Sequence, residues 1–152
     1  MRAIAAFLAA AEEARAAALL GDDAMASAAA GRAVRQREQV EPDDLDELGG
    51  LHIFPTEKEL YYRVETDVLL GHGDARAVAG AERAVEAFSD RAAPHWAFGD
   101  EAGARCNLAL VHLNGDQLDG VDAALRPVMD LPPAQRNRGI VVSAHRVRLR
   151  RT

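Results

Sequence analysis

The chain has 152 residues and a net charge of −6, and only 5% of its residues are aromatic. Its length suffices for one domain with a real core, and its wealth of alanine beside few β-branched residues favours packed helices over sheets. The acidic balance argues against binding of nucleic acid by the chain as a whole. The lone cysteine, Cys106, excludes an internal disulfide and fits a reducing cytoplasm. Glu12, Glu13 and Arg15 interrupt the alanine-rich start, which therefore predicts neither a membrane span nor a signal peptide.

The start of the chain predicts a first pair of helices over residues 2–39. A turn at Gly21, Asp22 and Asp23 separates a helix over residues 2–20 from an alanine-rich helix over residues 24–39. The second of these helices has no distinct apolar face. The apolar side of the first helix comprises Ile4, Phe7, Leu8, Ala11, Ala14 and Ala18.

A connection over residues 41–56 leads to a second predicted pair over residues 57–89. Within the connection, Asp43 can cap one or two turns of helix. Thr56 and Glu59 form a capping box, which predicts that the next long helix begins directly after Thr56. That helix runs to a glycine-rich turn, and the second helix of the pair follows. Its apolar stripe comprises Val78, Ala81, Val85 and Phe88.

Residues 100–130 predict a third pair, and residues 134–150 predict a closing helix. Asp100 can cap the first helix of the pair, Gly115 takes the left-handed conformation that ends it, and Asp116 can cap the second helix. Two prolines then close the pair, because proline has no amide hydrogen to continue a helix. The apolar stripe of the first helix comprises Ala102, Cys106, Ala109, Leu110 and Leu113. The stripe of the second comprises Leu118, Val121, Leu125 and Val128, and the closing helix has Ile140, Val141, Ala144 and Val147 at helical spacing.

These elements predict an internal repeat. The stripe that begins at Val78 recurs forty positions later at Leu118, and a Gly-Asp pair occurs at residues 21–22, 73–74 and 115–116. Each helix pair has apolar faces that it cannot bury alone, so it needs neighbours of the same kind. We therefore predict an all-α fold, a right-handed α-α superhelix of the tetratricopeptide kind. It comprises three antiparallel helix pairs plus a terminal helix, in a single domain over residues 1–152.

Several motifs resemble known families. One set of residues resembles the tetratricopeptide repeat, namely Asn107-Leu108-Ala109, Gly115-Asp116, Gly120, Ala124 and Pro132. Further segments, at residues 43–55, 98–105 and 131–136, are similar to the C-terminal helical-repeat region of high-GC bacterial transcription regulators. In those regulators an N-terminal helix-turn-helix domain binds DNA, and this chain has no room for one. The resemblance therefore implies a cytoplasmic regulatory module, either part of such a regulator or a stand-alone relative.

Motifs for catalysis, cofactors and metals are missing from the sequence. None of the five histidines has a second histidine or a cysteine at the spacing that would place both on one helical face, and no dinucleotide or phosphate-loop motif occurs. Cys106 lies on an apolar stripe, which indicates a small core residue. We therefore predict a protein that is not an enzyme and holds neither a cofactor nor a metal.

The predicted site lies on the first helices of the pairs, which line the concave side of tetratricopeptide stacks. Its candidate residues are Tyr61, Tyr62, Arg63, Arg105 and His112. They predict a surface that binds a peptide, a partner protein or a small effector. The alternative is that at least one of the two tyrosines belongs to the core.

Two further hypotheses remain open at the level of the sequence. One is a structural domain that forms homodimers or larger oligomers through an exposed end of the stack. The other is a nucleic-acid binder that uses the basic C-terminus, although arginines near a helix end also complement the helix dipole and keep the helix soluble. The six arginines of this segment are Arg136, Arg138, Arg146, Arg148, Arg150 and Arg151.

Overall fold

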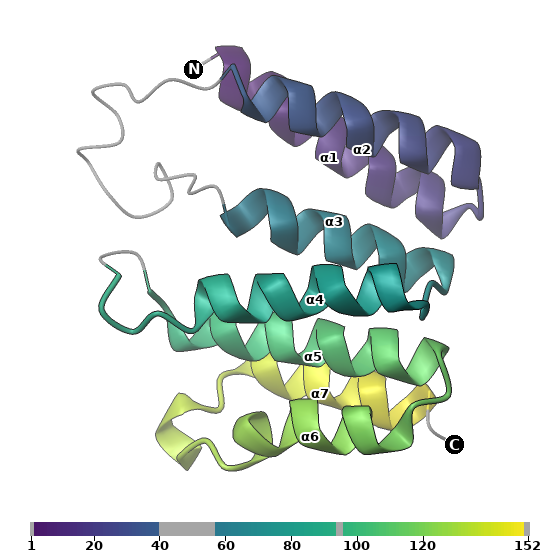
Figure 1. Cartoon of the computed structure of the whole chain (residues 1–152). Coiled ribbons are helices and arrows are strands. Elements are labelled where there is room, and N and C mark those ends of the chain that lie inside the picture. The colour runs from purple at the N-terminus through teal and green to yellow at the C-terminus, as the bar shows by residue number, and fades with distance from the viewer. Residues whose placement is uncertain (1, 40–56, 94–95, 151–152) are drawn as a thin grey trace. The chain divides into compact units, whose positions relative to one another are not determined.

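A computed structural model describes residues 2–39, 57–93 and 96–150, and every regular element in these ranges is a helix (Figure 1). The predicted all-α fold is therefore confirmed, whereas the handedness of the superhelix stays a prediction. The elements are α1 (Arg2–Leu19), α2 (Asp23–Arg37), α3 (Glu57–Leu70), α4 (Ala75–Phe88), α5 (Phe98–Asn114), α6 (Leu118–Met129), the single 3-10 turn η3 (Pro133–Gln135) and α7 (Arg138–Arg150). The short helix predicted after Asp43 and the Thr56 side of the capping box lie outside the described residues.

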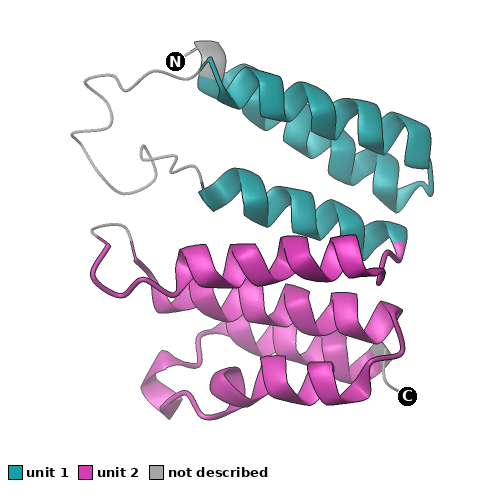
Figure 2. Ribbon diagram, viewed as in Figure 1, with its two compact units in different colours: residues 1–70 teal, residues 71–152 magenta. Residues whose placement is uncertain are grey.

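The chain divides into two compact units, Met1–Leu70 and Gly71–Thr152 (Figure 2). The first unit contains α1, α2 and α3, and the second contains α4 to α7. The predicted helix pair over residues 57–89 crosses this boundary, so that pairing and the single domain over residues 1–152 stay predictions.

The first unit is built on small side chains. Gly21 has a φ of +73°, the left-handed conformation that ends α1, and the Asp22 carboxylate then accepts a hydrogen bond from the amide of Met25 at 2.9 Å. This turn folds α2 back along α1, and α3 packs against both. Alanines on both helices let the two backbones approach closely. One core cluster comprises Phe7, Ala10, Ala11 and Ala33, and another comprises Ala17, Ala18 and Ala26.

The second unit is organised around α5. This helix contacts α4, α6 and α7, so it buries more than the one stripe that the sequence predicts. Glu101, Asn107 and Val111 are buried in addition to the predicted stripe residues, while Leu113 at the end of that stripe is only half-buried. The helix is central because its neighbours cover it on several sides.

The predicted capping of α5 and α6 is wrong in three details. Asp100 lies within the first turn of α5, because the helix extends back to Phe98, whose side chain packs on the core. Gly115 has a φ of −95°, and it is Asp116, with a φ of 56°, that takes the left-handed conformation. Asp116 therefore cannot cap α6; Gln117 occupies that position and makes no side-chain capping bond.

A close approach between two turns explains why Gly115 is a glycine. The turn before α4 and the turn after α5 touch through their backbones at Gly73 and Gly115. A Cβ added to Gly73 would lie 2.5 Å from the carbonyl carbon of Asn114 and 2.7 Å from the Cα of Gly115. The Asn114 amide also donates a hydrogen bond to the carbonyl oxygen of His72 at 3.1 Å. Two of the three Gly-Asp turns thus meet, and their glycines provide space rather than an unusual φ.

The predicted repeat between α4 and α6 is confirmed at its buried positions but shifted from the predicted stripe. Buried residues recur at a separation of forty, namely Ala81 with Val121, Ala84 with Ala124 and Phe88 with Val128. Val78 and Leu125 are only half-buried, and Leu118 is 51% exposed, because α6 turns that side away from α5.

The closing helix α7 begins later than predicted, at Arg138. The chain first makes the 3-10 turn η3, and Asn137 then accepts a hydrogen bond from the amide of Ile140 at 3.0 Å. This side-chain cap fixes where α7 can begin. Ile140 and Val147 are buried as expected, whereas Val141 is 54% exposed.

Candidate functional site

Three predicted site residues lie on α3 in the first unit. The Tyr62 ring meets the Phe7 ring edge to face at 6.4 Å between centroids, and it packs on the core cluster around Phe7. The Arg15 guanidinium lies 5.5 Å from the centroid of the same ring and forms an ion pair with Glu65 at 3.1 Å. Tyr62 is therefore partly buried against the core cluster, in keeping with the alternative that at least one tyrosine serves packing.

Arg63 is the one exposed member of this group, and Tyr61 is half-buried like Tyr62. The Tyr61 ring lies 6.2 Å from the Tyr62 ring, and the Lys58 ammonium is 5.9 Å from the Tyr61 centroid. The structure brings the two tyrosines together, but their role in binding stays a prediction.

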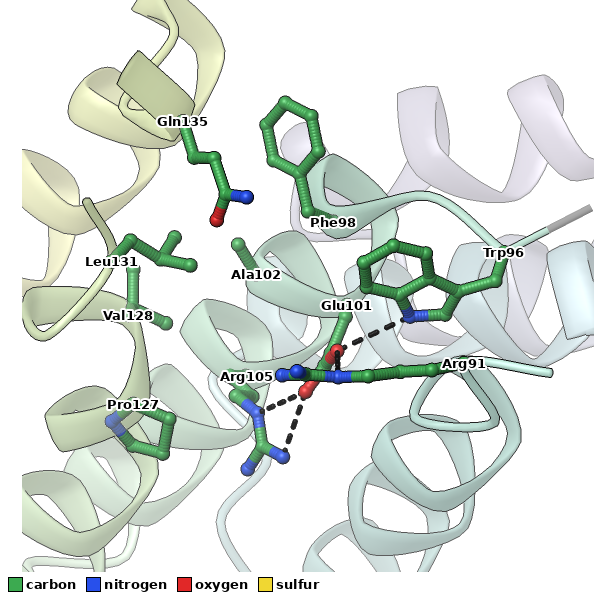
Figure 3. A pocket seen from close by; sticks show the side chains of 10 residues that line it. All are labelled: Arg91, Trp96, Phe98, Glu101, Ala102, Arg105, Pro127, Val128, Leu131 and Gln135. Atoms are coloured by element: carbon green, nitrogen blue, oxygen red, sulfur yellow. Dashed lines mark hydrogen bonds and ion pairs between the residues drawn. The ribbon is translucent and has the colours of Figure 1, made fainter. Parts of the chain in front are cut away.

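Arg105 belongs to a network around a buried carboxylate in the second unit. Glu101 is only 8% exposed and accepts hydrogen bonds from the Nε and Nη2 atoms of Arg105 at 3.2 and 3.0 Å. The Trp96 indole donates to the other Glu101 oxygen at 3.3 Å, and Arg91 lies 3.8 Å from that oxygen (Figure 3). Arg91 also lies 5.5 Å from the centroid of the Trp96 ring. These donors satisfy the buried carboxylate, and the network ties the loop before α5 to that helix.

The hollow beside this network is too small for a peptide or an effector. Its volume is about 70 Å³, and Phe98, Val128 and Leu131 form its apolar side, as Figure 3 shows. A few water molecules fit such a space, whereas ligand pockets usually measure at least about 300 Å³. The contacts of Arg105 are therefore those of a structural residue, and its role in ligand binding stays a prediction.

His112 fills the contact between α5 and α6. Its Nδ1 atom lies 2.7 Å from Oε1 of Gln117, and a Cβ added to Gly120 would lie 2.5 Å from the same nitrogen. Gly120 thus provides room for the imidazole ring. Arg105 and His112 lie on the same helix, but each has its own local partners and no shared pocket joins them.

A second hollow of this unit was not predicted from the sequence. It is an open groove of about 630 Å³ between α6 and α7, which both pack on α5 but hardly touch each other. We call it the α6–α7 groove. Its apolar lining comprises Leu125, Val128, Met129, Ile140, Val141, Ala144 and Val147, and its polar lining comprises Asp122, Arg126, Arg136, His145 and Arg148.

The chain between the two helices closes one end of the groove. Arg136 donates from Nε to the carbonyl oxygen of Leu131 at 2.8 Å and from Nη2 to that of Met129 at 3.0 Å. These carbonyls lie at and just beyond the C-terminus of α6, where a guanidinium also complements the helix dipole. Arg136 therefore ties the connection to the end of α6.

A weak sequence signal for the groove exists in hindsight. Met129 on α6 and Val141 on α7 are large apolar residues that the core does not cover, whereas Leu125 packs partly on the cluster of Ala102 and Cys106. Met129 is 60% exposed and Val141 54% exposed. Large apolar side chains in excess of what the core can bury are the mark of a binding surface.

The described residues contain no group of three metal-ligating side chains, and none of their helices is long and apolar enough to cross a bilayer. Cys106 is buried in the core as predicted, and burial raises the pKa of its thiol to about 11. A thiol that stays protonated at neutral pH is a poor nucleophile.

Comparison with protein-family models, with curated proteins and with solved structures finds no match for this chain. The family resemblances described above therefore depend on the residue motifs themselves.

Proposed function

We propose that this protein is a non-enzymatic helical-repeat module that binds a helical segment of a partner protein in the α6–α7 groove. The observation that carries the proposal is the groove itself, about 630 Å³ of open space with an apolar floor. That volume lies within the range of about 300 to 1,000 Å³ that is usual for binding sites. Amphipathic helices commonly bind in apolar grooves of this kind, with side chains spaced by three or four residues as anchors.

The local packing supports a helix as the occupant. In a stack of helix pairs, each helix is covered by neighbours on both sides of its pair. Among the described residues, α7 packs on α5 but has no second helix beside it on its Val141 side. A partner helix placed there would cover Met129 and Val141, which are 60% and 54% exposed.

The motif resemblance places this binding in a biological setting. Residues 43–55, 98–105 and 131–136 resemble the regulatory region of high-GC bacterial transcription regulators. In that setting the module would act in the cytoplasm, and partner or effector binding would control an attached or associated DNA-binding domain. The module itself would not contact DNA.

A pair of neighbouring valines provides a direct test of the groove. Helical peptides would be selected from a display library on the wild-type protein, and their affinities measured by fluorescence anisotropy. Val141→Arg places a charge in the groove and should weaken binding by about tenfold or more, as expected for an anchor position. Val142→Arg is the matched control, because Val142 is 52% exposed on the same helix but does not line the groove. Equal binding to both variants would refute the proposal.

Self-association is the second candidate function. Leu19 and Leu20, at the end of α1 in the first unit, are 71% and 84% exposed. Adjacent exposed leucines favour contact with another apolar surface, which a second copy of the chain can provide. Sedimentation would show a concentration-dependent dimer that Leu20→Glu abolishes, whereas a monomer at high concentration would remove this candidate.

A further inference from the structure

We infer that the α6–α7 groove selects an acidic partner, an amphipathic helix with carboxylates on both flanks of its apolar face. The inference rests on the proposed function of the groove and adds the charge of the partner. It follows from the side chains that border the apolar floor.

Both walls of the groove carry arginine. Arg126 comes from α6 and Arg148 from α7, and both are exposed side chains that line the groove. His145 accompanies Arg148 on α7, and Arg136 adds a third guanidinium at the closed end. The one acidic residue in the lining is Asp122. A helix in the groove would therefore have a cationic side chain on each side of it.

The positive charge of the groove contrasts with the rest of the protein. Residues 1–70 contain fourteen acidic residues against seven lysines and arginines, whereas residues 71–152 contain ten against eleven. No acidic residue follows Asp130, so α7 and the turn before it have arginine as their only charged side chains apart from histidine. An acidic ligand is therefore attracted to this groove in particular and repelled elsewhere.

The floor of the groove favours a protein over a nucleic acid as the acidic ligand. Val128, Ile140 and Val147 are themselves buried, so the accessible apolar lining consists of the aliphatic or thioether side chains of Leu125, Met129, Val141 and Ala144. A sugar-phosphate backbone would lose hydration against such a surface without gaining a partner. No aromatic side chain lines the groove to stack on a base, as single-stranded nucleic acids require. Apolar anchors between acidic flanks satisfy both the floor and the walls.

Two synthetic peptides would test the charge preference. Both would form helices with the same leucines at anchor spacing, but one would have glutamates and the other lysines on the flanks. Fluorescence anisotropy would measure their affinities for the wild-type protein, Arg148→Glu and Arg146→Glu. Arg146 is the matched control, since it is exposed on α7 but does not line the groove.

We expect the glutamate peptide to bind about tenfold more tightly than the lysine peptide, because ion pairs at two walls each contribute several-fold. This preference should decrease as the salt concentration rises from about 0.05 M to about 0.5 M. Arg148→Glu should weaken binding of the glutamate peptide and strengthen binding of the lysine peptide. Arg146→Glu should change the affinity for either peptide less than about twofold. The net charge of −6 strengthens the test, because a non-specific charge effect would favour the lysine peptide.

The contrary outcomes separate this inference from the proposed function. If the two peptides bind equally well and Val141→Arg abolishes the binding of both, the preference for an acidic partner is wrong, whereas the groove remains a binding site. Failure of both peptides to bind would overturn the inference together with helix binding in the groove. A dimer in sedimentation that Val141→Arg dissociates would assign the groove to a second copy of the chain and overturn the inference as well.

Discussion

The contact between the Gly73 and Gly115 turns leads to a quantitative prediction, that Gly73→Ala destabilises the second unit by about 2 kcal/mol. The atom nearest to the new Cβ would be the backbone nitrogen of Gly115, and the carbonyl carbon of Asn114 would lie 2.5 Å away. Ordinary contact begins at 3.4 Å, so the turns must separate by more than about 0.9 Å. Overpacking of this kind costs about 1–3 kcal/mol. Both sides of the contact are backbone, so no rotamer change can relieve it.

Two smaller effects act in opposite directions on this value. Separation of the turns weakens the hydrogen bond from Asn114 to the carbonyl of His72, which adds about 1 kcal/mol. Replacement of glycine by alanine also stabilises the folded state by about 0.4–1 kcal/mol, because an unfolded chain with alanine has less conformational freedom to lose on folding. The two effects nearly cancel, so steric overlap determines the result.

Urea unfolding would measure the change, with far-UV circular dichroism for the whole chain and tryptophan fluorescence for the second unit. Trp96 is the only tryptophan of the chain and lies in that unit. Gly80→Ala is the matched control within α4. A Cβ there would meet only the Arg83 guanidinium at 3.9 Å, so this change should stabilise the helix by about 0.5–1 kcal/mol. The reasoning is refuted if Gly73→Ala leaves stability unchanged or shifts it in the same direction as Gly80→Ala.

Three further predictions concern single side chains. Asp74→Ala removes the carboxylate that caps α4 through a 2.9 Å hydrogen bond to the amide of Ala77, and it should lower the free energy of unfolding in urea by about 1 kcal/mol. Asp116→Gly should leave that free energy unchanged or raise it, because position 116 has a φ of 56°. If Asp116→Gly were the more destabilising of the two, the cap assignments would be wrong. Burial raises the pKa of Cys106 from 9.0 to about 11, so the unfolded chain loses that proton first and stability should fall by about 3 kcal/mol as the pH rises through this interval. Cys106→Ala should lack this part of the pH dependence, and an identical dependence would exclude the thiol as its source. Glu101→Gln should cost about 2 kcal/mol and change the emission of Trp96, since the indole and the arginine lose a charged acceptor; unchanged emission would contradict the network.

Much of the secondary structure was predictable because its signals are local. The apolar period in α1, the glycine after it and the run of alanines in α2 depend on residues within a few positions of each other. Their boundaries agree with the structure to within about two residues. Capping at the third pair was wrong because its outcome depends on a distant partner. Gly115 was expected to take a left-handed φ, but it has a φ of −95°, and its glycine instead gives room to the backbone of Gly73, far away in the sequence.

The predicted site illustrates a similar division. Tyr62, Arg105 and His112 have the composition of a binding surface, yet each has a close partner in the fold. Two of these partners are local, since Glu101 lies one helical turn from Arg105 and Gln117 lies five residues after His112. The contact of Phe7 with Tyr62 instead follows from which helix faces meet.

The sequence by itself determined that the chain is helical, roughly where most of its helices lie, and that forty-residue spacing relates α4 to α6. These properties depend on propensity, periodicity and turn residues, which act over short distances along the chain. Only the tertiary structure decided which apolar residues are covered. α6 and α7 have apolar side chains on more than one face, and each helix can turn only one of them towards α5. The uncovered faces form the α6–α7 groove, because burial depends on the neighbours that a residue acquires in the fold.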